Sequence, residues 1–253
     1  TAHEAEIDVV VRHIAEYCQQ HNIPAADKVW TDRLSERLEL PSILPDGFDG
    51  KKWPCTEKTV PVIGILDDPA SQCQYPLELD FAKLSNTVIY GAPFTGKTTL
   101  LQTLVMSIAM LRRPDEASIY IMDFGGWNMS VLRDIPHVGG IANDNEPERL
   151  KKLILLISDV LQERKEKFSR LGVSNITAFR DSCGETIPDI FLIVDNFGAM
   201  IKMYPDMDTF FISLTGSGAN YGVYLVATGT ATNAVPMKIS QNIKNVLALQ
   251  MID

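Results

Sequence analysis

The chain has 253 residues and a formal charge of −9, with 45 % hydrophobic and 22 % charged residues. This length fits one large α/β domain, or one domain with an extension, and the composition is that of a globular chain. No apolar run reaches the ~20 residues of a membrane span, and the acidic start, Glu4 to Asp8, does not resemble a secretory signal. The acidic balance argues against duplex DNA as the main partner, because DNA-binding surfaces usually carry excess positive charge.

The cysteines give no sign of a disulfide framework or a zinc site. There are four, scattered along the chain without a C-x-x-C pair: Cys18, Cys55, Cys73 and Cys183. Such spacing indicates reduced thiols in a cytosolic setting.

The first quarter of the chain differs in composition from the rest. Apolar residues over 4–20 recur at helical spacing and predict an amphipathic helix. Its apolar face could bind a partner, but packing on the chain's own domain is the favoured interpretation. From Pro24 to Pro76 the chain carries seven prolines, which exclude long helices and predict an extended connector along a neighbouring surface. We therefore expect a helix and interdomain linker over 1–59 and a folded domain over 60–253.

From about residue 60 onward, strand-like and helix-like stretches alternate. Strands are predicted over 60–66, 77–81, 87–90, 118–123, 189–195, 222–228 and 245–251. Helices are predicted over 100–111, 146–171 and 207–216. This alternation indicates βαβ units, hence an α/β fold in which a mostly parallel sheet is flanked by helices.

The most specific motif is Gly91-Ala-Pro-Phe-Thr-Gly96-Lys97-Thr98, which matches G-x-x-x-x-G-K-[ST] between a predicted strand and helix. Backbone N–H groups and a helix N-terminus converge on phosphate oxygens in such a loop, and a bland glycine-rich turn is the alternative. Lys97 would reach the β- and γ-phosphates of ATP, and the Thr98 hydroxyl would bind Mg²⁺. The residues expected to bind nucleotide are Gly91, Ala92, Pro93, Phe94, Thr95, Gly96, Lys97, Thr98 and Thr99.

Two residues within this loop are unusual. Pro93 lacks an N–H donor, and Phe94 restricts the backbone where glycine is common. The amides from about Thr95 onward can still surround a phosphate. Either the affinity is reduced or the loop is held in one preset shape.

Polar residues close several predicted strands. Asp195 ends the apolar run 190–194, and we expect it to hold Mg²⁺ together with Thr98, although it could instead cap a following helix. Asn196 follows it, and an amide cannot act as a general base. Thr228 could sense the γ-phosphate or the attacking water, or be a plain strand-end threonine. Asp123 ends another strand, before a loop at 124–127 that could move with nucleotide state, although a static tight turn is the favoured interpretation.

Taken in order, these segments resemble the motor ATPase domain of the FtsK/SpoIIIE family over roughly 60–253. The segments are Gly91–Thr98, Ile121–Asp123, Asp134–Val138, Glu163-Arg164, Leu192–Asp195 and Tyr221–Thr228. The stretch 64–72 and the Gly-x-Pro start of the loop are similar to the later ATPase domains of the EssC/EccC proteins, which are membrane-anchored ATPases of type VII secretion. The best match is the C-terminal, third ATPase domain of a Firmicutes-type EssC.

The resemblance implies a RecA-like P-loop fold that binds ATP and Mg²⁺ on the cytoplasmic side of the bacterial plasma membrane. It implies preceding ATPase domains in the same chain, a hexameric full-length protein, other subunits of the secretion machine, and WXG100-type secretion substrates. An arginine finger would come from another subunit or domain. Arg164 and Arg180 could serve a neighbour in that way, although surface arginines are usually plain solvated charge.

The chain also departs from the family's pattern. DNA-pumping members usually carry glutamate after the metal aspartate and Ala-Thr-Gln-Arg-Pro after the sensor strand, whereas here Asn196 and the run 227–231, Ala-Thr-Gly-Thr-Ala, stand in their place. We therefore expect ATP binding with weak or absent hydrolysis in isolation, and a domain whose C-terminal end is incomplete at Asp253. The alternatives are a cargo-recognition module without a nucleotide role and, with least support, a DNA translocase domain.

Overall fold

The computed structural model describes residues 5–24, 26, 33–44, 47–54 and 58–251. These residues belong to two compact units, one within 1–36 and 66–75 and the other within 37–65 and 76–253. In the first unit, α1 (Glu6–Gln20) is the helix that the apolar spacing predicts. Packing of its apolar face on another part of the chain stays a prediction.

The second unit is built around a six-stranded sheet in the order β5-β4-β6-β7-β3-β8, with every neighbouring pair parallel. Its strands are β3 (Thr87–Tyr90), β4 (Ala117–Asp123), β5 (Val138–Asn143), β6 (Asp189–Asp195), β7 (Val223–Gly229) and β8 (Asn245–Ala248). A separate two-stranded sheet pairs β1 (Val62–Asp68) with β2 (Cys73–Glu78). The large sheet confirms the predicted α/β fold with a mostly parallel sheet.

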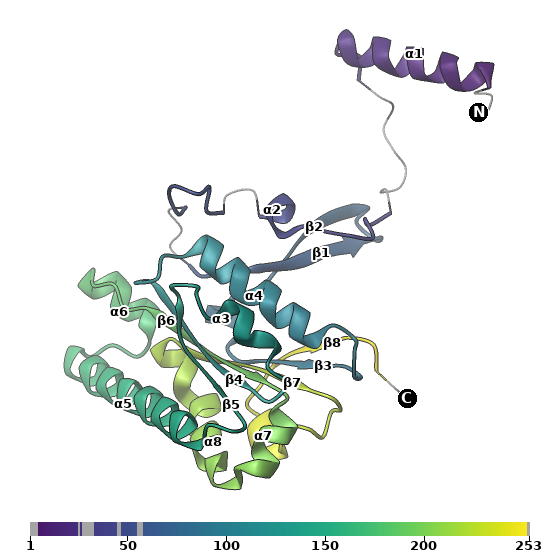
Figure 1. The fold of residues 1–253 in the computed structure, drawn as a ribbon. Coiled ribbons are helices and arrows are strands. Elements are labelled where there is room, and N and C mark those ends of the chain that lie inside the picture. The colour runs from purple at the N-terminus through teal and green to yellow at the C-terminus, as the bar shows by residue number, and fades with distance from the viewer. Residues whose placement is uncertain (1–4, 25, 27–32, 45–46, 55–57, 252–253) are drawn as a thin grey trace. The chain divides into compact units, whose positions relative to one another are not determined.

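Helices cover both faces of the large sheet, as Figure 1 shows. The α-helices of this unit are α2 (Leu40–Ile43), α3 (Phe81–Leu84), α4 (Lys97–Leu111), α5 (Pro147–Leu171), α6 (Ile176–Cys183), α7 (Phe197–Met203), α8 (Asp208–Ser217) and α9 (Met237–Ser240). Three short 3₁₀ segments accompany them in the described chain, namely η1 (Asn128–Leu132), η2 (Pro205–Met207) and η3 (Gly218–Tyr221).

Alternation along the strands divides the core into two layers. In β6, Leu192 and Val194 pack with α5, α7 and α8 on one face, whereas Phe191 and Ile193 pack with α3 and α4 on the other. All seven residues of β6 are buried. Because successive side chains point to opposite faces, a strand covered on both faces is apolar between its ends. This explains the uninterrupted apolar runs in the sequence.

Part of the proline-rich connector lies along α4. Ile43 and Leu44 pack with Val62 and with Leu111 at the end of α4. The Trp53 indole donates a 2.8 Å hydrogen bond to the carbonyl of Ala109. The residues described within 40–54 therefore follow a neighbouring surface, as the composition predicts, while residues 25, 27–32, 45–46 and 55–57 of the connector lie outside the described chain.

Some predicted elements were wrong or missing. The strand expected over 77–81 ends at Glu78, and Phe81 instead opens α3, with its ring packed against Phe191 and Tyr224. The pattern also missed β5, α6 and α7. The β5 sequence, Val-Gly-Gly-Ile-Ala-Asn, contains two glycines and lacks the continuous apolar run of the inner strands.

Parallel pairing places the carboxyl ends of the strands at one edge of the sheet. Asp123 is aligned with Asp195 across β4 and β6, and Tyr90 with Gly229 across β3 and β7. Residues that follow these strands are distant in sequence but adjacent in space. This edge is where ligands bind in open α/β sheets.

Candidate nucleotide site

The loop between β3 and α4 is held by its own groups. Gly96 has φ 94°, a left-handed conformation that glycine adopts without strain, and it directly precedes the first turn of α4. A Cβ at Gly91 would lie 2.6 Å from the Thr95 hydroxyl, and that hydroxyl donates to the carbonyl of Ala92 across 2.8 Å. The loop thus has a defined shape that directs it into the helix N-terminus.

Phe94 stands at the tip of this loop. Its φ is 64°, although it is not glycine, and its side chain is fully exposed. A bulky residue in this conformation is strained by about 1–3 kcal/mol. Whether this residue lowers the affinity for phosphate or holds the loop in one preset shape stays a prediction.

The Lys97 ammonium lies across the loop. Its Nζ donates to the carbonyls of Gly91 at 2.8 Å and Ala92 at 2.7 Å. A lysine has three donors, so one remains for an anion. Partial burial lowers the Lys97 pKa, while the negative charge of Asp195 opposes that shift. A partly buried cation with an unused donor favours a negatively charged ligand.

Asp195 is the centre of the polar contacts at this edge. Its side chain is buried, and it accepts a 2.8 Å hydrogen bond from the Thr98 hydroxyl and a 2.6 Å bond from the Thr228 hydroxyl. A Cβ at Gly125 would lie 2.3 Å from Oδ2 of Asp195. The loop after β4 therefore approaches the carboxylate as closely as only glycine allows.

Asn196 and Thr228 form hydrogen bonds around the Asp195 carboxylate. The Asn196 N–H donates to the Thr228 hydroxyl at 2.7 Å, and its side-chain amide donates to the carbonyl of Phe124 at 3.1 Å. Asn196 has φ 60°, which asparagine tolerates better than most residues. Thr228 is fully buried, so its hydroxyl orients Asp195 and is shielded from the pocket. This arrangement favours the strand-end interpretation of Thr228 over direct sensing.

The loop after β4 forms one wall of the site. The Asp123 carboxylate accepts hydrogen bonds from the N–H groups of Gly125 at 2.9 Å and Met129 at 3.0 Å. Gln102 of α4 donates to the carbonyl of Asn128 at 2.8 Å. These contacts fit the expected tight turn. The motifs did not reveal Gln102, although it lies four residues after Thr98 and so on the same face of α4.

These groups surround a pocket of about 500 Å³. Its lining includes Lys97, Thr98, Thr99, Gln102, Asn128, Asp195 and Asn196. Oxygen ligands are what Mg²⁺ prefers, and Thr98 Oγ1 and Asp195 Oδ2 lie 2.8 Å apart at this pocket. The donor set therefore fits a Mg²⁺–triphosphate group. Thr228, predicted to belong to the site, does not line the pocket and acts through its hydrogen bond to Asp195.

The two candidate arginines lie elsewhere. Arg164 is buried, not solvated, and it donates to the carbonyls of Tyr221 at 2.5 Å and Pro188 at 2.7 Å. Burial lowers its pKa to about 10, with the negative charge of Asp189 opposing the shift. The expectation of a plain surface charge was wrong for Arg164, because its guanidinium satisfies backbone carbonyls that water does not reach.

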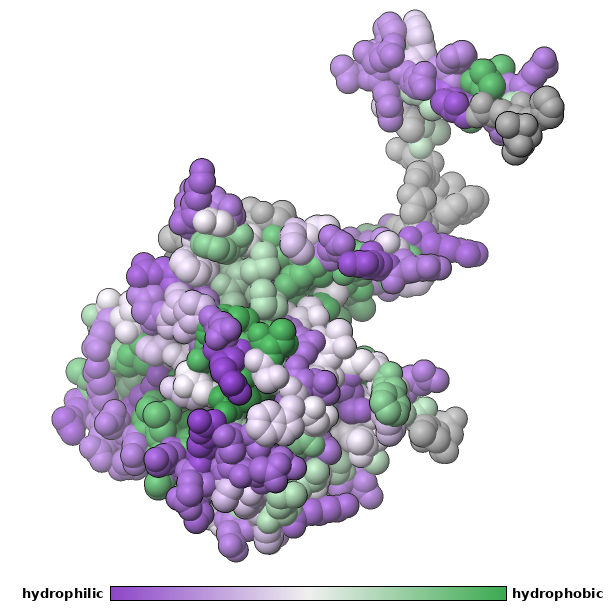
Figure 2. All heavy atoms as spheres, in the orientation of Figure 1, coloured by the Kyte–Doolittle hydropathy of each residue, from purple (hydrophilic) through white to green (hydrophobic). Residues whose placement is uncertain are grey.

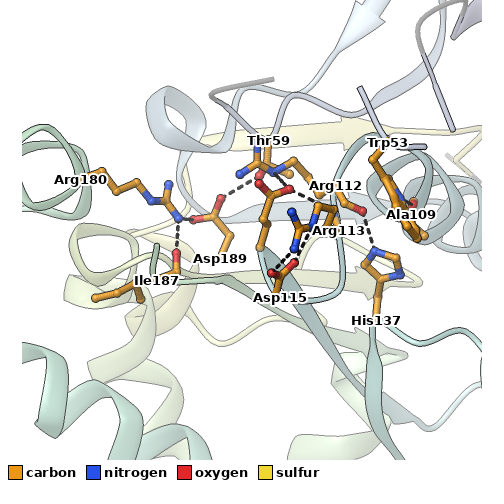
Figure 3. Close-up of polar contacts among 11 residues, drawn as sticks. Trp53, Thr59, Ala109, Arg112, Arg113, Asp115, His137, Arg180, Ile187 and Asp189 are labelled. Atoms are coloured by element: carbon orange, nitrogen blue, oxygen red, sulfur yellow. Dashed lines mark hydrogen bonds and ion pairs between the residues drawn. The ribbon is translucent and has the colours of Figure 1, made fainter. Parts of the chain in front are cut away.

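Arg180 belongs to a polar cluster at the opposite, amino edge of the sheet. Figure 3 shows its guanidinium between Ile187 and Asp189, the first residue of β6, with Thr59 on the other side of that carboxylate. The distances from Asp189 are 3.0 Å to Arg180 and 2.8 Å to Thr59. Asp189 thus joins α6, through Arg180, and the connector, through Thr59, to the end of β6 away from Asp195.

The structure shows no candidate metal-binding cluster of side chains among the described residues. Among them, no three His, Cys, Asp or Glu side chains are grouped so that they could hold a metal ion. Cys18, Cys73 and Cys183 are free thiols, and Cys55 lies outside the described chain. No helix in the described ranges is long and apolar enough to cross a membrane.

A Gly-Lys-Thr loop between a strand and a helix, with an aspartate closing another parallel strand beside it, defines a RecA-like P-loop ATPase domain. The chain belongs to the FtsK/SpoIIIE family, whose model matches residues 58–253. It is 30 % identical over 254 residues to the type VII secretion system protein EssC of Staphylococcus aureus (strain MRSA252), covering 99 % of this chain and 17 % of that protein. To the ESX secretion system protein EccC of Thermomonospora curvata it is 28 % identical over 264 residues, covering 99 % and 20 %.

Solved structures that are similar to this chain come from the same group of secretion ATPases. The cytoplasmic domain of the Thermomonospora curvata type VII secretion ATPase EccC matches with a TM-score of 0.82 and 26 % identity over 91 % of this chain and 28 % of that one. ATPases 2 and 3 of the same protein, in complex with a signal sequence peptide, match with a TM-score of 0.75 and 27 % identity over 82 % and 39 %. The chain spans no more than about a fifth of the curated relatives described above.

Proposed function

We propose that this chain is an ATP-binding domain of a type VII secretion motor ATPase, with weak or absent hydrolysis in isolation. The observation that carries the proposal is the convergence of Lys97, Thr98 and Asp195 on one pocket, with Asn196 where an efficient ATPase has glutamate. Family membership supports nucleotide binding as the general activity.

Each residue has a distinct role in the proposed site. Loop amides and the free donor of Lys97 hold the phosphates, and Thr98 and Asp195 supply oxygen ligands to Mg²⁺. The metal, when bound, neutralises charge that develops on the phosphate oxygens. Asn196 can hydrogen-bond a water molecule but cannot accept its proton, so binding is retained and turnover is slow.

Calorimetric titration with ATP, with and without Mg²⁺, tests the proposal. We expect the purified domain to bind ATP more tightly with Mg²⁺, and Lys97→Ala to reduce the affinity by at least about 100-fold, since a charge-assisted contact is lost. Lys83→Ala is the control, because Lys83 is exposed and forms an ion pair with Asp80 at its own helix end. Failure of the unmodified domain to retain ATP at millimolar concentration would refute the proposal.

The wider assignment follows the EssC and EccC relatives. We propose that residues 60–253 are the third, C-terminal ATPase domain of such a protein and that 1–59 connect it to the preceding domain. Its partners would be the other ATPase domains, the subunits of a hexamer at the cytoplasmic side of the membrane, and WXG100-type substrates. Limited proteolysis of the longer protein checks the boundary, since cleavage should concentrate within 1–59.

Recognition of secretion cargo is a second candidate function. The solved EccC fragment that matches this chain holds a signal sequence peptide, which favours a peptide-binding role for related domains. If peptide binding is the whole function, a cargo peptide binds while Mg·ATP does not. Titrating both ligands separates the two functions, and binding of both would indicate a domain that performs each of them.

A further inference from the structure

The outer strand β5 offers an unpaired backbone. It ends the sheet on one side, and among the described residues it pairs with β4 alone. The Val138 N–H donates to the carbonyl of Ile135, and Ala142 and Asn143 are buried, so the backbone available to another extended chain lies around Gly139 and Gly140. Gly139 and Gly140 leave this part of the backbone without covering side chains.

A hollow of about 540 Å³ borders the strand on the side of α5. Its apolar walls include Tyr120 of β4 and Leu153 and Leu156 of α5. Leu156 is 42 % exposed and the adjacent Leu155 60 % exposed, so apolar surface faces solvent here. Figure 2 shows green apolar atoms between purple polar ones over this part of the second unit.

Gly140 opens directly onto free space. A Cβ built on it would meet no atom within 4 Å, and its φ is not in the left-handed range. A side chain at this position can therefore enter the hollow without strain in the backbone. By contrast, a Cβ at Gly139 would lie 2.6 Å from the ring of Tyr120.

The charge of the hollow is positive, against an overall formal charge of −9. Its charged lining residues are Arg133, Arg149 and Lys152, without a carboxylate among them. Arg149 forms an ion pair with Glu146 at 2.5 Å. For Arg133 and Lys152, no carboxylate in the described chain lies within ion-pair distance. The side chains of Arg133 and Lys152 are thus available to an acidic ligand beside the apolar walls of the hollow.

Basic residues near an edge strand can also guard it against aggregation. Here, however, Lys152 and Arg149 project from α5, and Arg133 precedes β5 by several residues. Guarding the edge does not require an apolar hollow. The combination of a free strand edge, apolar walls and cations matches strand addition by a peptide, in which the backbone gives affinity and side-chain contacts give specificity.

We propose that β5 binds an extended acidic peptide segment, which adds to the sheet as a further parallel or antiparallel strand. Its apolar side chains contact Leu153 and Leu156, and its carboxylates pair with Arg133 and Lys152. This interaction is separate from nucleotide binding, because the hollow and the phosphate pocket have no lining residue in common.

A labelled synthetic peptide tests the proposal. The probe has about ten residues, within the usual length of a strand, and alternates Val or Leu with Asp or Glu. Fluorescence anisotropy with the purified chain should show saturable binding that weakens with salt, and amide hydrogen exchange should slow over 138–143. A peptide with lysine in place of each acid should not bind.

Two variants locate the site, and two others are controls. Gly140→Leu fills the hollow and should reduce affinity by at least about tenfold, as should Arg133→Glu combined with Lys152→Glu. Lys202→Glu on α7 is the charge control and should bind like the unmodified chain, and so should Lys97→Ala, which affects nucleotide alone. Equal binding by all variants would overturn the proposal, as would absence of binding or a peptide that becomes helical without protecting β5.

Discussion

The Thr98 hydroxyl donates a 2.8 Å hydrogen bond to Oδ2 of Asp195, although the two residues lie 97 positions apart in the chain. Thr98 is in the first turn of α4, and Asp195 is the last residue of β6. Parallel strands place both at the same edge of the sheet. The pair is therefore a product of topology, and it joins the phosphate loop to the aspartate proposed to hold Mg²⁺.

Replacing Asn196 tests whether the missing glutamate limits hydrolysis. Asn196→Glu should raise turnover by at least about tenfold, because a carboxylate can accept a proton from water. Glutamate tolerates the left-handed backbone less well, so the variant should lose about 1 kcal/mol of stability. Steady-state phosphate release and thermal unfolding measure the two effects.

Asn196→Gln is the matched control, since it has the length of glutamate without its charge and should leave turnover unchanged. Vigorous hydrolysis by the unmodified domain, equal to that of Asn196→Glu, would contradict this account.

Thr228 should matter through Asp195. Thr228→Val keeps the shape but removes the acceptor of the Asn196 N–H and a donor to Asp195, at a cost of about 1–3 kcal/mol. We also expect Mg²⁺ to improve ATP affinity less than in the unmodified domain, while affinity without metal changes little. Denaturant unfolding and calorimetry report these quantities. Thr228→Ser restores the hydroxyl and should recover the Mg²⁺ effect; if it does not, the positioning role is wrong.

Gly125→Ala should disturb the same carboxylate from the other side. The added Cβ would lie 2.3 Å from Asp195 Oδ2, so the loop or the carboxylate must move. We expect Mg·ATP affinity to fall by about tenfold or more. Gly140→Ala enters open space and serves as the control. Unchanged affinity in Gly125→Ala would show that the close approach has no bearing on the metal site.

Arg164 is expected to be structural. Arg164→Met removes donors to the buried carbonyls of Tyr221 and Pro188 and should lower the free energy of unfolding by about 2–4 kcal/mol. ATP affinity of the remaining folded protein should be unchanged. Arg170→Met, on the exposed side of α5, should change stability by less than about 0.5 kcal/mol. If Arg164→Met instead abolished the ATP hydrolysis that a neighbouring subunit or domain stimulates, without lowering stability, Arg164 would be an arginine finger.

His137 should make the domain sensitive to mild acid. Burial lowers its pKa, and its Nε2 lies 2.7 Å from the carbonyl of Arg112. As the pH falls below about 6.5, the unfolded chain takes up a proton that the folded chain resists, so stability decreases by at most about 1.4 kcal/mol per pH unit. Above about pH 6.5 the contribution of His137 to the free energy of unfolding is fully present. His137→Asn should reduce this dependence in thermal unfolding, whereas His13→Asn, at an exposed position, should not.

The sequence predicted the inner strands and the long helices well. The runs 87–90 and 189–195 coincide with β3 and β6, and 146–171 is α5 to within a residue. These segments are long or strongly apolar, so their periodicity is clear. The edge strand β5 and the short helices α6 and α7 were missed, because glycine content and short length weaken the pattern.

The candidate site was predicted unevenly for a similar reason. Gly91 to Thr98 are contiguous, and their spacing alone indicates a phosphate-binding loop. Gln102 and Asn128 carry no motif and enter the pocket only because α4 and the loop after β4 meet. The roles assigned to the individual site residues stay predictions until nucleotide binding is measured.

By itself, the sequence determined the α/β class, the phosphate loop and the family, since each depends on neighbouring residues along the chain. Tertiary structure alone decided that Thr228 braces Asp195, that Arg164 is buried, and that β5 leaves an open, positively charged edge. Those properties depend on which strands become neighbours and which faces are covered, and such long-range packing is not encoded in any local spacing.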